Sequence, residues 1–316
     1  MKACFTFILC IGFLSCKQTN EVVDPISFSV TNLPALPQGS GHYQMWVRYY
    51  IFNKVSGENS PQHEGDFLSV GEFNIADDGS LRSLSGGTPE FSLPAGNDPQ
   101  LLSDVCVSVQ TPGGLAKADH SEPGSILIGG KFYGDASNAI ADMNTSFTGG
   151  LKSNFSFVSG KCTIVAPTSP PDSNSGVWFV EAGATPTVGL KNLPALPGTW
   201  RYEGWIVDQS TTTYYSTGKF ARTDSADYDG PGPNAGTIGA GYNFPGEDFV
   251  RGSFHPNLTS TQYTFLVTIE PFPDNSPSPF FLHLLKTSPP LSVTRTQSLQ
   301  NVMATSAATA RISIRR

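Results

Sequence analysis

The sequence predicts an all-β protein built from two tandem antiparallel β-sandwich domains. One set of motifs occurs twice in the same order, Asn-Leu-Pro-Ala-Leu-Pro, Tyr-x-x-Trp and Ser-x-Gly-x-Phe, first within 32–73 and again within 192–220. Self-similarity at a fixed spacing is the sequence signature of a duplicated structural unit. The chain holds 32 glycines and 25 prolines but only 14% charged residues. This composition favours short strands joined by tight turns over surface helices.

Period-2 alternation of apolar and polar residues identifies the strands. It is clearest in Tyr263 to Ile269, where Thr264 and Thr268 face away from the apolar side. We expect strands in the first repeat at 26–31, 42–52, 67–75, 105–110, 125–133 and 162–165. In the second repeat we expect them at 177–181, 201–208, 214–221, 263–269, 279–285 and 310–314.

The domain boundaries follow from composition. Residues 1–15 are a signal segment, 16–24 a tether and 25–166 the first sandwich. The Pro- and Ser-rich stretch 167–175 has too few apolar residues to form a core, so we expect it to be a linker. Residues 176–316 then form the second sandwich. Enough apolar and aromatic residues are present for two separate hydrophobic cores.

The N-terminus predicts export. Lys2 precedes an apolar run from Phe5 to Leu14, and polar residues begin directly after Cys16. Such a run is too short to span a membrane as a domain's helix and is typical of a cleaved signal. The segment around Cys16 resembles the lipobox of bacterial lipoproteins, which implies lipid attachment to Cys16. An ordinary secretory signal without lipid is the alternative.

Cys106 and Cys162 are the two cysteines that remain beyond the signal and the lipid site. Both lie in the predicted first repeat, and an exported compartment permits a disulfide between them. Two free buried thiols are the other interpretation, and the sequence leaves both open.

Charge and motifs exclude several classes of function. The net charge is −7 at pH 7, and basic residues do not cluster enough to track a phosphate backbone, so no nucleic-acid partner is expected. No hydrolase, phosphate-loop or redox motif occurs. The acidic run 224–230 fails the pattern of a calcium loop and is interpreted as an acidic turn. We therefore expect no enzyme activity, no cofactor and no metal.

Four aromatic residues are the candidate ligand contacts. Tyr43 and Trp46, and likewise Tyr202 and Trp205, are three positions apart on a strand and so point to opposite faces. One member of each pair belongs to the core, and the other faces solvent, a second element or a ligand. The Leu-Pro-Ala-Leu-Pro element is interpreted as structural, because its prolines force an extended approach to the next strand.

These motifs together resemble a known family. Leu-Pro, then Tyr-(Gln/Glu)-x-Trp, then Ser-(Val/Thr)-Gly-x-Phe is similar to the extracytoplasmic domain of anti-sigma-K factors, related forms of which occur in lipoproteins of Bacteroidota. The likeness covers about 45 residues of each repeat. It implies an all-β envelope domain that senses or binds. Sigma-factor control is not implied, because the chain shows neither a cytoplasmic helical domain nor a central membrane helix.

The combined interpretation is a lipid-anchored protein of a Gram-negative cell envelope, at the outer membrane or the periplasmic face. It would be non-enzymatic, with a structural or ligand-binding role, and its partners would be the membrane through its lipid and a glycan or an envelope protein. Two alternatives remain: a glycan-binding surface protein, and a secreted hydrolase with carboxylates in the loops 59–66, 117–123 and 223–236.

Overall fold

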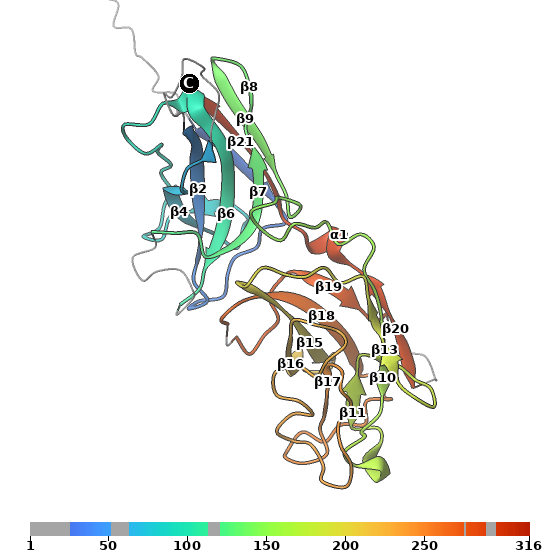
Figure 1. The fold of residues 1–316 in the computed structure, drawn as a ribbon. Helices are drawn as coiled ribbons and strands as arrows, with labels where there is room; N and C mark the ends of the chain where they lie inside the picture. Colours follow the sequence, from blue (N-terminus) through green and yellow to red (C-terminus); the bar gives the residue numbers. More distant parts are fainter. Residues whose placement is uncertain (1–25, 52–62, 113–120, 275, 289–294) are drawn as a thin grey trace, which may run out of the picture.

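The computed structural model describes residues 26–51, 63–112, 121–274, 276–288 and 295–316. Over these residues the protein is almost entirely antiparallel β-sheet, which confirms the predicted fold class. The strands form two units that lie side by side (Figure 1). The helices are short: η1 (Pro99–Leu101), η2 (Pro170–Asp172) and α1 (Met303–Ser306).

Two sheets form the first unit. The larger has the order β5 (Leu81–Arg82), β4 (Leu68–Ile75), β2 (His42–Ile51), β6 (Leu102–Gln110) and β7 (Ser125–Lys131), with β3 (His63–Glu64) paired to β2. The smaller has the order β1 (Ile26–Thr31), β21 (Thr309–Arg315), β9 (Asn138–Met143) and β8 (Tyr133–Gly134). Their facing sides enclose the apolar core.

A single nine-stranded sheet rolls into a nearly closed barrel in the second unit. Its order is β16 (Thr213–Phe220), β15 (Trp200–Asp208), β18 (Tyr263–Pro271), β19 (His283–Lys286), β20 (Thr296–Asn301), β10 (Ser159–Ile164), β11 (Gly176–Trp178) and β17 (Gly246–Asp248), with β14 (Leu190–Lys191) paired to β10. A small two-stranded sheet, β12 (Val180–Glu181) and β13 (Thr187–Val188), lies beside it.

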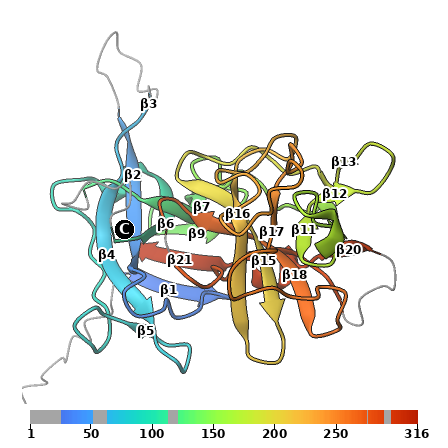
Figure 2. The same cartoon turned by 90° about the horizontal axis from the view of Figure 1, so that it is seen from below.

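The two units exchange their last strands. Strand β10 ends the first repeat, yet it pairs with β14 and β20 of the second unit through Gly160. Strand β21 ends the second repeat, yet it pairs with β1 and β9 of the first unit through Ala310. The red β21 accordingly runs among the blue and green strands of the first unit (Figures 1 and 2). Each unit therefore needs a strand from the other repeat.

This exchange corrects the predicted boundaries. The first unit comprises 26–143 and 309–315, and the second extends from 159 to 301. The stretch 167–175 is not a linker, because it is held within the second unit. The Thr168 backbone N–H donates to the Asp248 carboxylate at 2.8 Å, and the Ser175 hydroxyl donates to the Pro256 carbonyl at 2.8 Å. Hydrogen bonds rather than apolar side chains fix this segment.

The hydrophobic core is continuous across both units, where two separate cores were expected. The exchanged strands help to explain the difference, since each carries apolar side chains into the other unit. Cys162 and Ile164 of β10 and Ile312 and Ile314 of β21 all belong to the same buried cluster. The two units are therefore one packed body.

The duplicated motifs occupy equivalent surroundings. The Tyr43 hydroxyl donates to the Pro34 carbonyl at 3.0 Å, and the Tyr202 hydroxyl donates to the Pro194 carbonyl at 2.7 Å. Each tyrosine also stacks on the Phe of the Gly-x-Phe motif, with ring centroids 5.6 Å apart in both units. The Leu-Pro-Ala-Leu-Pro segment thus supplies the carbonyl that anchors a core tyrosine.

Replacing Ile312 by Ala tests the contribution of the exchanged strand. Ile312 is fully buried in β21, and truncation of such a side chain leaves a cavity that costs about 2–5 kcal/mol. Ile238→Ala, at a side chain that is 70% exposed, serves as the control and should change stability by less than about 0.5 kcal/mol. Urea denaturation measures both. Equal unfolding free energies for the two variants would contradict an essential packing role for β21.

Candidate functional site

The four aromatic residues predicted to contact a ligand are buried. Tyr43, Trp46, Tyr202 and Trp205 are each at most 2% exposed. The predicted opposition of faces is correct, because both tyrosines join the main core and each tryptophan lies in a separate cluster on the other side of its sheet. Those outer faces are themselves covered, by Phe147 among others in the first unit. The prediction of ligand-facing aromatics is therefore wrong.

Each buried tryptophan belongs to a polar network on the outer face of its sheet. In the first unit the Trp46 Nε1–H donates to Ser108 Oγ at 2.8 Å. Beside this pair the Gln110 amide donates to Gln44 Oε1 at 3.0 Å, and the Gln44 amide donates to Ser69 Oγ at 2.9 Å. Uncharged amide groups are thus hydrogen-bonded to one another away from water, and the Gln110 Oε1 atom is buried without a partner among the described residues.

The second unit repeats this network with carboxyl groups in place of amides. The Trp205 Nε1–H donates to Thr268 Oγ1 at 2.9 Å, and strand pairing puts Glu203 and Glu270 at the positions of Gln44 and Gln110. Lys219 Nζ lies 2.6 Å from Glu203 and offsets part of its charge. Glu270 is fully buried, and it lines a cavity.

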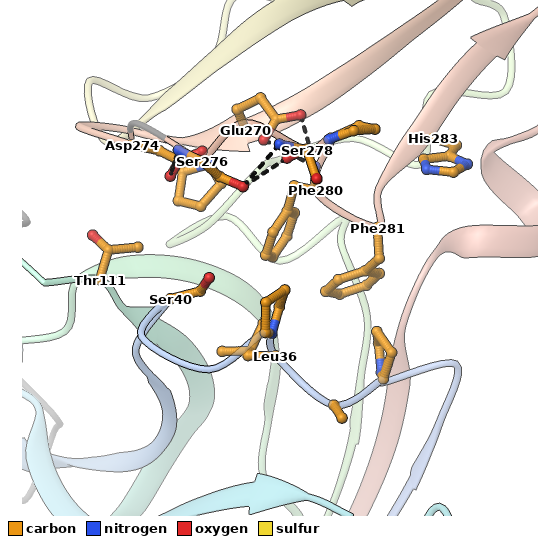
Figure 3. A pocket seen from close by; sticks show the side chains of 15 residues that line it. Leu36, Ser40, Thr111, Glu270, Asp274, Ser276, Ser278, Phe280, Phe281 and His283 are labelled. Atoms are coloured by element: carbon orange, nitrogen blue, oxygen red, sulfur yellow. Dashed lines mark hydrogen bonds between the residues drawn. The ribbon is translucent and has the colours of Figure 1, made fainter. Parts of the chain in front are cut away.

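That cavity, of about 290 Å³, lies between the two units. Residues from the first unit form one wall, and residues from the end of β18 to the start of β19 form the other (Figure 3). The lining is Pro34, Ala35, Leu36, Pro37, Ser40 and Thr111 on one side, and Glu270, Pro271, Asp274, Ser276, Ser278, Pro279, Phe280, Phe281 and His283 on the other. We define this space as the inter-unit cavity. A largely apolar concave site between structural units is the usual setting of a ligand pocket.

The inter-unit cavity exists because the duplication is imperfect. In the second unit Trp200 follows the Leu-Pro-Ala-Leu-Pro turn, and its Nε1–H donates to the Ile126 carbonyl of the first unit at 3.2 Å. Two residues of the first unit correspond to Trp200. Alignment of the paired strands matches it with Gly41, whereas the turn hydrogen bond to the second proline of the motif is made by the backbone N–H of Ser40. A Cβ on Gly41 would lie 1.9 Å from the Gln110 carbonyl oxygen, so no side chain fits there. The Trp200 indole therefore fills the contact that the second unit makes with the first. The first unit has no indole at the equivalent place, and the inter-unit cavity lies there.

The carboxyl group of Glu270 has a raised pKa. Burial raises its pKa to about 8, against hydrogen bonds that favour the ionised form. The Phe280 backbone N–H donates to its carboxyl oxygens at 3.0 and 3.1 Å, and the Thr268 hydroxyl contacts it as well. Through the bond to Phe280 the carboxyl group fixes the wall on which two phenylalanine rings lie, with centroids 4.4 Å apart.

Two acids and a histidine line the same cavity, which is a combination that hydrolases use. No hydrogen bond or ion pair among the described residues joins His283 to Glu270 or Asp274, and Figure 3 shows His283 apart from both acids. Burial lowers the pKa of His283, so its imidazole is neutral. Among the described lining residues, no hydrogen bond links the histidine to an acid or to a serine hydroxyl.

A second acidic group joins the loop after β16 to strand β17 in the second unit. Burial, reinforced by neighbouring carboxylates, raises the pKa of Asp227 to about 8 and that of Glu247 to about 9. Asp229 lies near both and Gly246 N–H donates to Asp227 at 2.9 Å. In the described part of the chain no three His, Cys, Asp or Glu side chains are placed to share a metal ion.

The loops proposed for hydrolase carboxylates are only partly described. Residues 59–62 and 117–120 lie outside the described residues. Glu64 is engaged by Arg48 at 2.5 Å and by Lys131 at 2.8 Å, so it is a structural ion pair. The loop 223–236 carries Asp227 and Asp229 of the acidic group above.

Cys106 and Cys162 are both buried and free, so the disulfide interpretation is wrong. The strand exchange is the reason, because β10 carries Cys162 into the second unit while Cys106 stays in β6 of the first. Burial raises the pKa of each thiol well above its usual range. Cys16, the predicted lipid site, lies outside the described residues.

The comparisons with known proteins returned no match: no family model, no curated protein and no solved structure is similar to this chain at a significant level. Within the described residues, none of the helices has the length and apolar character needed to cross a bilayer. The sequence and the geometry above are therefore the basis for assigning a function.

Stability should fall as the pH rises from about 5 to about 9. Glu247 and Glu270 have folded pKa values of about 9 and about 8, above those of ordinary carboxyls, so the folded state holds protons that the unfolded chain releases. The stabilisation is complete below the unfolded pKa and is lost as the pH passes the folded pKa, with a slope of up to about 1.4 kcal/mol per pH unit for each acid.

Glu247→Gln and Glu270→Gln should each make this decline shallower, as measured by urea denaturation at pH 5, 7 and 9. Glu90→Gln, at an exposed position, is the matched control and should retain the full decline. A wild-type stability that rises with pH over this range would contradict the assignment of protonated acids.

Proposed function

We propose that this chain is a non-enzymatic binding protein of the bacterial cell envelope, with its ligand site in the inter-unit cavity. The observation that carries the proposal is the asymmetry between two otherwise equivalent contacts. Trp200 fills the contact on one side of the interface, whereas Ser40 and Gly41 leave a cavity of about 290 Å³ on the other. An unfilled apolar space beside an otherwise continuous core favours occupation by a ligand group.

The lining indicates the chemistry of that ligand. Two phenylalanine rings, one leucine and several prolines supply apolar surface, and serine and threonine hydroxyls supply hydrogen bonds. No Lys or Arg is among the lining residues, so an anionic ligand would find no counter-charge there. The cavity is suited to a neutral, ring-shaped or branched apolar group.

The chemistry of the acids supports binding over catalysis. Glu270 is fully buried, and its oxygens accept from Phe280 and contact Thr268, which leaves it a positioning role in the wall. His283 has no hydrogen-bonded partner among the acids of the cavity. A hydrolytic mechanism would need a general base within hydrogen-bond reach of the proton that it removes.

The cellular address remains the one that the N-terminus predicts. From the lipobox-like segment we expect Cys16 to begin the mature chain and to carry lipid, at the outer membrane or the periplasmic face of a Gram-negative cell. The likeness of the motifs to anti-sigma-K extracytoplasmic domains is compatible with an envelope domain that binds. In this arrangement the chain presents the inter-unit cavity outside the cytoplasm.

Ser40→Trp tests the binding site by copying the second unit into the first. An indole at position 40 should fill the inter-unit cavity and abolish binding of a neutral aromatic probe, N-acetyltryptophanamide, in calorimetric titration. Ser156→Trp, at an exposed serine that does not line the cavity, should bind the probe as the wild type does. A Ser40→Trp protein that is folded by circular dichroism and binds undiminished would refute the proposed site.

Cys16→Ala tests the proposed anchor. Loss of the lipidated thiol should move the protein from the membrane fraction to the soluble fraction of cells that express the full chain. Stable anchoring takes at least two attached acyl chains, and the variant would have none. The shift to the soluble fraction should therefore be nearly complete. Unchanged partitioning of Cys16→Ala, with Cys106→Ala as the control, would count against lipid attachment.

A further inference from the structure

We infer that the ligand is an extended polypeptide segment that places one aromatic side chain in the inter-unit cavity. This inference rests on the proposed function and names the class of ligand that the same site takes. Three observations support it. They are the shape of the surrounding groove, the way Trp200 packs at the equivalent contact, and the carboxylate of Asp274 at one end of the groove.

The inter-unit cavity is the centre of a longer groove. A space of about 560 Å³ adjoins it on one side, and the two share Ser40, Thr111 and Asp274 among their lining residues. A space of about 550 Å³ adjoins it on the other side and shares Pro34, Phe281 and His283. The groove therefore follows the extended segment from residue 32 to residue 40 along the junction of the units. A linear chain matches this shape better than a compact small molecule does.

Trp200 shows which group fits against this kind of surface. It begins a strand of the second unit, follows an extended Leu-Pro-Ala-Leu-Pro segment, and inserts its indole against the first unit at the equivalent contact. It also lies 6.0 Å, between ring centroids, from Phe280, which belongs to the wall of the inter-unit cavity. The molecule thus already contains one instance of an aromatic side chain docked from an extended chain.

An aromatic side chain suits the centre of the groove better than a sugar does. The central lining contains four prolines, which donate no hydrogen bonds, and no Asn, Gln, Lys or Arg. A sugar ring carries several hydroxyl groups that each need a partner when buried, whereas an aromatic side chain has one polar group at most. Serines 40, 276 and 278 lie where the central and flanking spaces meet and can bond to a peptide backbone.

Charge fixes a further property of the peptide. Asp274 lines both the central space and one flanking space, and no described residue forms an ion pair with it. Within the described parts of the chain, its side chain accepts a single hydrogen bond, from the Ser276 backbone N–H at 2.9 Å. Because the lining of all three spaces contains no Lys or Arg, a Lys or Arg of the ligand has a counter-charge here and a Glu does not.

Calorimetric titration of the full chain with four probes tests the inference. The probes are the heptapeptide acetyl-Lys-Ser-Ser-Trp-Ser-Ser-Lys-amide, its version with Ala for Trp, its version with Glu for both Lys, and N-acetyltryptophanamide. The Lys/Trp peptide should bind at least tenfold more tightly than N-acetyltryptophanamide, and the Ala version should not bind. Ser40→Trp should abolish binding of the peptide, while Ser156→Trp should not.

Asp274→Asn, which keeps an oxygen for the Ser276 N–H, should reduce the preference for the Lys peptide over the Glu peptide by about two- to fivefold. Equal affinities for the peptide and for N-acetyltryptophanamide would overturn the polypeptide assignment and leave the proposed site standing. Binding of cellohexaose instead of the peptides would also overturn it, in favour of a glycan. Absence of binding by every probe would reject the proposed function itself.

Discussion

The hydrogen-bonded insertion of each repeat's last strand into the other unit is the constraint on which the rest of this molecule depends. Strand β10 lies between β14 and β20, and β21 lies between β1 and β9, in matching register. Neither sheet is complete without its guest strand, and an unpaired strand position would expose a row of backbone donors and acceptors. The exchange therefore explains why two copies of one module share a continuous core and why they meet along a fixed, pseudo-symmetric junction.

Departures from that symmetry give the junction its chemistry. The duplicated scaffold is preserved closely, down to the tyrosine that bonds a proline carbonyl in each unit. The side chains at the junction have diverged instead. Trp200 closes one contact, Ser40 and Gly41 open the other, and the amide pair Gln44 and Gln110 has become the carboxyl pair Glu203 and Glu270. The cavity thus lies where the two repeats differ in their side chains.

The sequence predicts the local structure of this protein well and its long-range pairing poorly. Alternation and turn residues locate β2, β6 and β18, because these signals are carried within a few residues. Strands β10 and β21 occupy equivalent places in the two units, so each can pair with the sheet of either unit. No pattern within a few residues shows which sheet each strand joins. For the same reason the stretch 167–175 was wrongly predicted to be a linker. The long-range pairing also decides that Cys106 and Cys162 lie in different units, which the sequence left open. The opposition of Tyr43 and Trp46 followed from strand geometry, but the cover that buries Trp46 comes from the distant Phe147. A position-by-position comparison of the two repeats, Gln110 against Glu270 above all, is the signal in the sequence that could have located the cavity.

The strand exchange also orders events in time. The second unit is built from residues 159–301, whereas the first unit lacks its β21 until residues 309–315 have been made. A chain that emerges from its N-terminus therefore completes its later module before its earlier one. During that interval the strand position between β1 and β9 is empty, and the backbone groups at its edges are unpaired. Those edges can pair with neighbouring molecules until the final residues arrive.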